Sequence, residues 1–300
     1  MSSLWESAAS VLARFGEVDG RLVAAALVLH VANHGLRSVA WRNVIAAAYP
    51  ATRVPVLGVA SAYAVGVALN AVVPGRGGDA AKVALVRLGI GGSSVPTIVS
   101  TMSVVVLFDL AAATLLLLGI AATGAIPFAP DLGRLPLLLA GAAGAAAVVA
   151  LAGRRVRGAL TRLWAAARQG GAILRTPARY ASRVAAPQAG AWACRIGVVY
   201  LLMAAFGIPP TVPDAAVVMV LCGASTLVPL TPGGAGTQQV MLAFALSEAA
   251  TAAAVLSFSI GMQAGITAVN ALLGVLAGMV AFRTLHPLAA IRAGIRLARA

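Results

Sequence analysis

The chain has 300 residues, of which 61% are hydrophobic and only 10% are charged, and its mean hydropathy is +0.96. A soluble domain of this size needs far more charge on its surface, so the composition excludes a soluble globular protein. The formal net charge is +14. The arginine-rich stretches contain neither interspersed aromatic residues that would stack on bases nor a motif that would enter a DNA groove, so we expect no binding to nucleic acid.

The first 20 residues are short of the apolar length of a spanning helix and carry three acidic side chains. Their apolar residues share one helical face, which suits a helix lying at the membrane interface. These are Leu4, Ala8, Val11, Leu12 and Phe15. We therefore expect an amphipathic N-terminal segment over 1–20.

Seven hydrophobic segments follow, each near or above the length of about 20 residues that spans a bilayer as a helix. The abundant Ala and Gly favour helices packed through small residues over a barrel of alternating strands. We predict an all-α polytopic membrane protein. The segments are 21–36, 55–73, 95–122, 135–152, 188–207, 213–230 and 249–282.

Two glycine-rich motifs interrupt this series. One is Pro74-Gly75-Arg76-Gly77-Gly78-Asp79, followed by a short amphipathic stretch over 80–90; the other is Thr231-Pro232-Gly233-Gly234-Ala235-Gly236, followed by 237–247. Proline and clustered glycine end a helix, and bare backbone at membrane depth is tolerated only where protein buries it or it lines a cavity. Each motif predicts the tip of a re-entrant helical hairpin. The alternative, in which 55–73 and 213–230 cross fully, has the same hydropathy.

The surroundings of the two hairpins match, since each lies between a span and a long hydrophobic segment. One further span, 135–152, separates the two units and inverts the second, which is the pattern of an inverted-repeat transporter with a midplane site. The predicted organisation is a first repeat over 21–123, a linking span with a basic loop over 124–187, a second repeat over 188–283 and a basic tail over 284–300.

Charge gives the expected orientation. Eight arginines lie between Arg154 and Arg183, and four more lie in or next to the tail. With the basic loop 153–187 and the C-terminus placed in the cytoplasm, Arg37, Arg42, Arg53 and Arg87 also fall inside, whereas six of the eight acidic residues fall outside. This satisfies the positive-inside rule for a multi-pass protein of the cell membrane.

The hairpin tips are the predicted site. A short helix starts after each tip, and helix N-termini attract phosphate or carboxylate. Arg76 adds a planar fork suited to phosphate, and Asp79 either caps the helix or pairs with Arg76 or Lys82. The predicted substrate-binding residues around the tips are Asn70, Gly75, Arg76, Gly77, Gly78, Asp79, Lys82, Thr231, Gly233, Gly234, Gly236, Gln238 and Gln239.

Asp109, which also belongs to the predicted substrate-binding residues, lies far from either end of its hydrophobic segment; a role in proton coupling and a structural ion pair are both open. A carboxylate at that depth should face the bundle interior and find a partner, for which Arg76 and Lys82 are the candidates. His30 and His34 share a helical face, but two ligands without a nearby carboxylate or thiolate do not make a metal site. No Walker A loop, nucleophile elbow or dinucleotide fingerprint occurs, so we expect no metal, no cofactor and no enzymatic activity.

At these motifs the chain resembles the membrane domain of the lysylphosphatidylglycerol-synthase family, described as flippase-like. The resemblance runs from about Leu36 to Arg283. It rests on Leu36-Arg37 with Trp41-Arg42, on Asn70 with the first glycine motif, on Asp109 and on the second glycine motif. Relatives often carry a glutamate after the second motif, where this chain has Gln238-Gln239. No segment is long enough for the soluble aminoacyl-transferase domain of full synthases.

The resemblance implies a flippase-like translocator of a lipid or lipid-linked precursor with an anionic head group. Its expected partners are membrane lipids: anionic phospholipid, polyprenyl phosphate or a lipid-linked glycan. A secondary transporter of a small anionic solute shares the site but predicts a cavity sealed from lipid. A third alternative is a non-transporting membrane partner on which a lipid-modifying enzyme or glycosyltransferase docks through the basic loop 153–187.

Overall fold

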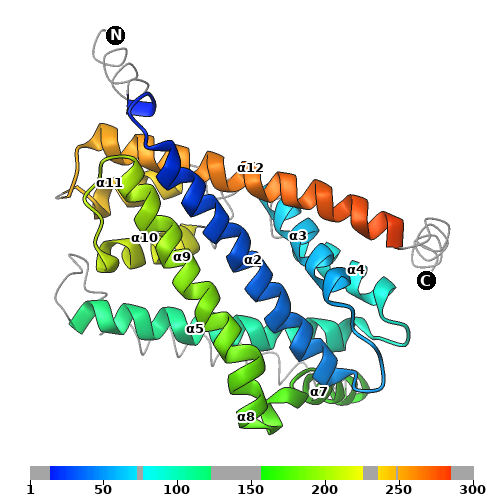
Figure 1. The fold of residues 1–300 in the computed structure, drawn as a ribbon. Helices are drawn as coiled ribbons and strands as arrows, with labels where there is room; N and C mark the ends of the chain where they lie inside the picture. The colour runs from blue at the N-terminus through cyan, green and yellow to red at the C-terminus, as the bar shows by residue number, and fades with distance from the viewer. Residues whose placement is uncertain (1–13, 73–76, 123–156, 226–235, 248, 285–300) are drawn as a thin grey trace.

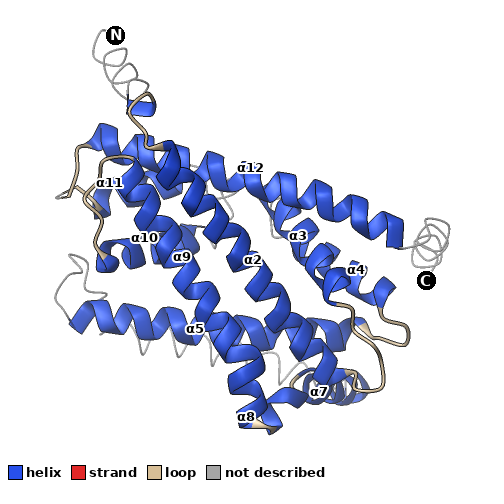
Figure 2. Cartoon of the chain, in the orientation of Figure 1, coloured by secondary structure: helices blue, strands red, loops and turns tan. Residues whose placement is uncertain are grey.

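The computed structural model describes residues 14–72, 77–122, 157–225, 236–247 and 249–284. Within these ranges every regular element is a helix, as Figure 2 shows. The predicted all-α fold is therefore confirmed. In chain order the helices are α2 (Gly20–Ala48), α3 (Val56–Val72), α4 (Gly77–Gly89), α5 (Val95–Ala122), α7 (Arg157–Gly170), the 3₁₀ helix η4 (Ala172–Arg175), α8 (Pro177–Tyr180), the π-helical turn η5 (Ala181–Ala185), α9 (Ala186–Ala205), α10 (Val212–Ser225), α11 (Thr237–Ala245) and α12 (Ala252–Thr284).

Four helical segments are long and apolar enough to cross a membrane: Gly20–Ala48, Val95–Gly119, Pro177–Ala205 and Ala252–Ala281. Their outer surfaces are apolar as well. On α12 the side chains at spacings of three and four are at least half exposed, and these are Leu272, Val275, Leu276 and Met279. Such a continuous apolar face is unfavourable in water and is what a lipid-facing helix presents. The chain is a multi-pass membrane protein.

The first span differs from its predicted limits. The sequence interpretation ends it at residue 36 and places Arg37 and Arg42 in a cytoplasmic loop, but α2 continues to Ala48. Arg37 thus lies inside the helix. The prediction was wrong because hydropathy treats each arginine as exposed to lipid or water, whereas the Arg37 charge is paired with Asp109 on α5.

Helices α2 and α9 pack along each other in opposite directions (Figure 1). The Asp19 amide before α2 donates to the Ala205 carbonyl at the end of α9, at 3.2 Å. At the other end of the pair, Asn43 Nδ2 donates to the Arg183 carbonyl at 2.8 Å. These two contacts fix the antiparallel register of the central pair.

The contacts among the eight helices α2–α5 and α9–α12 are symmetric between the two halves of the chain. Helix α3 packs against α2, α4 and α12, and helix α10 packs against α9, α11 and α5. Helix α4 also contacts α5, as α11 contacts α12, and α2 contacts α5 and α12, as α9 contacts α12 and α5. Exchanging α2, α3, α4 and α5 for α9, α10, α11 and α12 in order therefore leaves the pattern of contacts unchanged.

The α3–α4 pair is packed through glycine. A Cβ atom on Gly78 would lie 1.9 Å from the Gly66 carbonyl oxygen, and one on Gly66 would lie 2.2 Å from Lys82 Cγ. Only glycine at both positions permits this approach of two backbones. Helices α3 and α4 have 17 and 13 residues, and α10 and α11 have 14 and 9. The tips that would join each pair, 73–76 and 226–235, lie outside the described residues, so the re-entrant course remains a prediction.

The described part of the predicted basic loop 153–187 is helical rather than irregular. Helix α7 is held at its end by Gln169, whose Nε2 donates to the Ala48 carbonyl at 3.1 Å and whose Oε1 accepts from the Thr97 hydroxyl at 3.2 Å. Leu163 and Trp164 on α7 are 54% and 68% exposed. The predicted linking span 135–152 and the tail 285–300 lie outside the described residues.

Candidate functional site

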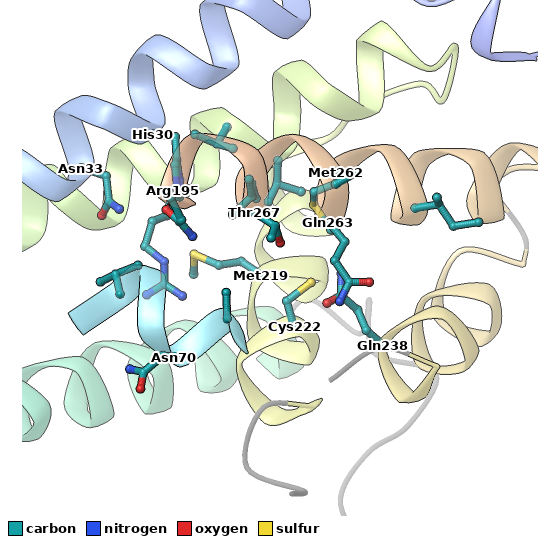
Figure 3. Close-up of a pocket in the computed structure, with 18 residues that line it drawn as sticks. His30, Asn33, Asn70, Arg195, Met219, Cys222, Gln238, Met262, Gln263 and Thr267 are labelled. Atoms are coloured by element: carbon teal, nitrogen blue, oxygen red, sulfur yellow. Dashed lines mark hydrogen bonds between the residues drawn. The ribbon is translucent and has the colours of Figure 1, made fainter. Parts of the chain in front are cut away.

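A cavity of about 680 Å³ lies among α2, α3, α9, α10, α11 and α12. It is the meeting place of helices from both halves of the chain, and Figure 3 shows its lining. Much of the wall is apolar. The polar lining residues are His30, Asn33, Asn70, Arg195, Gln238, Gln263, Thr267 and Asn270.

Arg195 supplies the positive charge of this cavity. It belongs to α9, is partly buried, and extends into the space between α3 and α10 in Figure 3. Its guanidinium carbon lies 5.2 Å from the centre of the Trp192 ring, a cation–π contact. Among the described residues no carboxylate forms an ion pair with it. A guanidinium at membrane depth without such a partner is costly, so the cavity favours an anion.

Two amide oxygens in the cavity wall have no hydrogen-bond partner among the described residues. Asn33 is only 4% exposed, and its Oδ1 is buried and unpaired, as is Oδ1 of Asn70. The orientation of the Asn70 amide follows from its neighbour, because Nδ2 donates to the Asp79 carboxylate at 3.2 Å. A buried acceptor without a donor is destabilising, so each of these two oxygens lowers the stability of the described packing.

Asp79 is held beside the cavity by two partners. Its Oδ1 accepts from Lys82 Nζ at 2.8 Å as well as from Asn70. The Lys82 ammonium also lies 4.9 Å from the centre of the Tyr63 ring. The Asp79–Lys82 pairing, one of the predicted alternatives, is therefore present. Asp79 does not line the central cavity; it lines a separate hollow of about 560 Å³ between α4 and α5.

The two glutamines at the start of α11 have different contacts. Gln238 is buried and lines the cavity. Gln239 fixes the start of α11, since its Oε1 accepts from the Gly236 amide at 2.7 Å and its Nε2 donates to Gln263 Oε1 on α12 at 2.8 Å. Gly236 has φ +86°, which favours glycine. A neutral amide serves both bonds where relatives often have a glutamate.

Asp109 pairs with Arg37, not with Lys82, which corrects that sequence expectation. The two side chains form a bidentate ion pair, with Arg37 Nη1 donating to Oδ1 at 3.0 Å. Trp192 Nε1 also donates to Oδ1 at 2.9 Å, and Arg37 Nε donates to the Tyr63 hydroxyl at 2.7 Å. This cluster ties α2, α3, α5 and α9 together. Asp109 is outside the cavity lining, and its geometry is that of a structural pair.

His30 and His34 form a polar cluster with Asn270 on α12. Each Nε2 lies 2.9 Å from Asn270 Oδ1, and the two Nε2 atoms are 3.0 Å apart. His30 and Asn270 both line the cavity. The cluster joins the first and last long helices through an interhelical hydrogen bond that spans 240 positions of sequence.

Two of the residues predicted from the sequence to bind substrate, Asn70 and Gln238, line this cavity. Sequence reasoning overlooked Arg195, although an arginine inside a 20-residue apolar helix was the available signal. Gly77 and Gly78 begin α4. The predicted site residues Gly75, Arg76, Thr231, Gly233 and Gly234 lie outside the described residues.

Helices long enough to cross a bilayer, around a cavity lined by both apolar and polar side chains, define a polytopic membrane protein. Residues 4–274 match the family described as the lysylphosphatidylglycerol synthase TM region, which covers most of the chain. The chain belongs to this family. No match was found among curated proteins or solved structures.

Proposed function

We propose that the protein is a flippase-like translocator of a lipid or lipid-linked precursor with an anionic head group. The observation that carries this proposal is Arg195, a partly buried guanidinium facing a cavity whose described lining includes no carboxylate. A phosphate is the ligand that such a planar fork binds best. Family membership supports handling of a lipid, and the site chemistry supports the anionic head group.

The composition of the cavity wall suits an amphiphile. Apolar side chains from α3, α9, α10 and α12 alternate with the polar ones, and include Val67, Val199, Met219 and Ile260. The phosphate would bind Arg195, and the other polar atoms of the head group would lie against the polar part of the lining, such as Gln263 and Thr267. Acyl or prenyl chains would remain against the apolar wall and the bilayer, because burying them in a polar site costs free energy.

The exchange of helix contacts supports a mechanism for movement. We propose that α2–α5 and α9–α12 are inverted repeats, since the equivalent helices α2 and α9 run antiparallel along each other. Rocking of one unit against the other around the cavity would then open it alternately to each side. In the proposed orientation, the α7–α8 end of the bundle and the C-terminus lie on the cytoplasmic side of the cell membrane. No covalent step is part of this proposal.

The test is native mass spectrometry with lipidomics on gently purified protein, comparing wild type with Arg195→Gln and Arg195→Lys. We expect a phosphate-bearing lipid to co-purify with wild type, to be retained partly by Arg195→Lys and to be lost by at least about tenfold in Arg195→Gln, because charge-assisted bonds contribute about 1.5–3 kcal/mol each. Arg21→Gln, at the exposed start of α2, is the matched control and should retain the lipid.

Translocation itself is measured in liposomes with a fluorescent analogue of the lipid that co-purifies. Wild type and Arg21→Gln should move it across the bilayer, and Arg195→Gln should not. Arg76→Ala tests the predicted hairpin-tip cation by the same readouts. Equal, non-selective lipid retention in all variants would contradict the proposal and favour a small-solute transporter or an enzyme-docking partner.

A further inference from the structure

A second pocket lies where α2 ends, away from the central cavity, and the two share no lining residue. It has a volume of about 320 Å³, within the usual range of ligand pockets, and lies between the last turns of α2 and the segment that runs through η4, α8 and η5. In Figure 1 this is the end of the bundle marked by α7 and α8. Three of its lining residues are arginines: Arg42, Arg179 and Arg183.

Hydrogen bonds hold the Arg42 side chain and the Arg183 backbone in place. Arg42 Nε donates to the Val54 carbonyl at 3.0 Å, which holds this side chain against the turn after α2. Asn43 Nδ2 donates to the Arg183 carbonyl at 2.8 Å. Arg183 itself lies in the π-helical turn η5, a rare geometry that occurs most often at functional sites.

The charge around the pocket is uncompensated within the described chain. None of the described carboxylates lines it, and neither Arg179 nor Arg183 forms an ion pair with a described residue. The positive-inside rule explains why arginines lie on the cytoplasmic side, but it does not require several of them to line the same pocket. Here three of them, from two segments 137 positions apart at Arg42 and Arg179, line one concavity. Convergence of like charges is unfavourable unless an anion joins them.

We propose that this pocket binds a phosphate group, as a second anion site distinct from the translocation cavity. The guanidinium group of arginine can donate two parallel hydrogen bonds to phosphate oxygens. Basic pockets between helices near the membrane surface bind anionic lipid head groups. The phosphate belongs either to an anionic phospholipid of the surrounding leaflet or to a free phosphate in solution. A zwitterionic lipid is excluded from the site, because its own ammonium group would meet three guanidinium groups.

The experiment compares wild type with an Arg179→Gln/Arg183→Gln double variant. The matched control is Arg168→Gln/Arg175→Gln, which removes the same charge from exposed positions at the same end of the bundle that do not line this pocket. One arm measures phosphatidylglycerol retained from mixed phosphatidylcholine nanodiscs by native mass spectrometry. The other arm titrates inorganic phosphate against detergent-purified protein and follows ³¹P line broadening. Circular dichroism checks that all proteins remain folded.

We expect the Arg179→Gln/Arg183→Gln variant to lose binding by about tenfold or more, while the control loses less than about twofold. Loss in the phosphatidylglycerol arm identifies a lipid ligand, and loss confined to the inorganic phosphate arm identifies a soluble one. Equal loss in both double variants would show a general surface-charge effect and overturn the proposal, as would no loss in either. All of these proteins are also measured with Arg195→Gln added, so that lipid held in the central cavity does not contribute to the signal and failure of either site is seen separately.

Discussion

Breaking the Arg37–Asp109 pair should reveal how much of the fold depends on it. Asp109 accepts two bonds from Arg37 and one from Trp192, and the side chains of the pair are only 15% and 22% exposed. Removing one partner leaves a largely buried charge, which costs about 3–5 kcal/mol. Partial exposure places the expected loss for Asp109→Leu or Arg37→Met near the lower limit, about 3 kcal/mol. Removing both charges should cost less than either single change, since the Tyr63 hydroxyl then loses only a donor and Trp192 Nε1 only an acceptor, and no buried charge is left unpaired.

The measurement is a double-mutant cycle on the free energy of unfolding, obtained by titrating the detergent-purified protein with SDS and following far-UV circular dichroism. A coupling energy of about 2 kcal/mol or more is expected, at the upper part of the range for contacting residues. Arg21→Met, which removes an exposed charge from the same helix, should change stability by less than about 0.5 kcal/mol. Additivity of the two single changes would refute the reasoning, because it would mean that the native pair contributes no mutual stabilisation.

Two further predictions concern the hairpins. Gly78→Ala places a Cβ atom 1.9 Å from the Gly66 carbonyl oxygen, so α3 and α4 must separate. The free energy of unfolding should fall by at least the usual overpacking cost of about 1–3 kcal/mol, which is measured as a lower melting temperature. Gly35→Ala in α2, with nothing within 4 Å of the new atom, should be neutral or stabilising. A Gly78→Ala protein as stable as wild type would contradict the close packing of the α3 and α4 backbones at Gly66 and Gly78. Gln239→Leu removes the hydrogen bonds to Gly236 and Gln263 and should lower the free energy of unfolding by about 1–3 kcal/mol. Gln239→Glu should cost less, since the Gln263 amide can turn to donate to the new carboxylate. Equal losses of the two variants in thermal unfolding would show that these hydrogen bonds do not stabilise the protein.

The positions of the helices were predictable because lipid contact leaves a direct signal in hydropathy. The segment 95–122 coincides with α5, and the short stretches after the two glycine motifs coincide closely with α4 and α11. The end of the first span was not predictable in this way. Its continuation past Arg37 depends on Asp109, which lies 72 positions later, and no local pattern records such a partner.

The site was predictable to a lesser degree, since its parts come from both halves of the chain. Asn70 and Gln238 were identified from the glycine motifs beside them, and they do line one cavity. Arg195 has no motif beside it, so only its unusual depth in an apolar helix marks it. The His30–Asn270 contact joins residues 240 positions apart, a pairing that requires three-dimensional information.

The polar side chains of α2 have a consequence for how the protein is made. This helix carries His30, Asn33, His34 and Arg37, and a single arginine at the centre of a span already costs about 2.5–3.5 kcal/mol during insertion by the translocon. Its partners emerge later, Asp109 on α5 and Asn270 on α12. At about 5–20 residues per second, the 240 positions between His30 and Asn270 take roughly 10–50 s to synthesise. Helix α2 therefore gains its full set of contacts only after α12 has been synthesised, and its polar face must be sheltered from lipid until then.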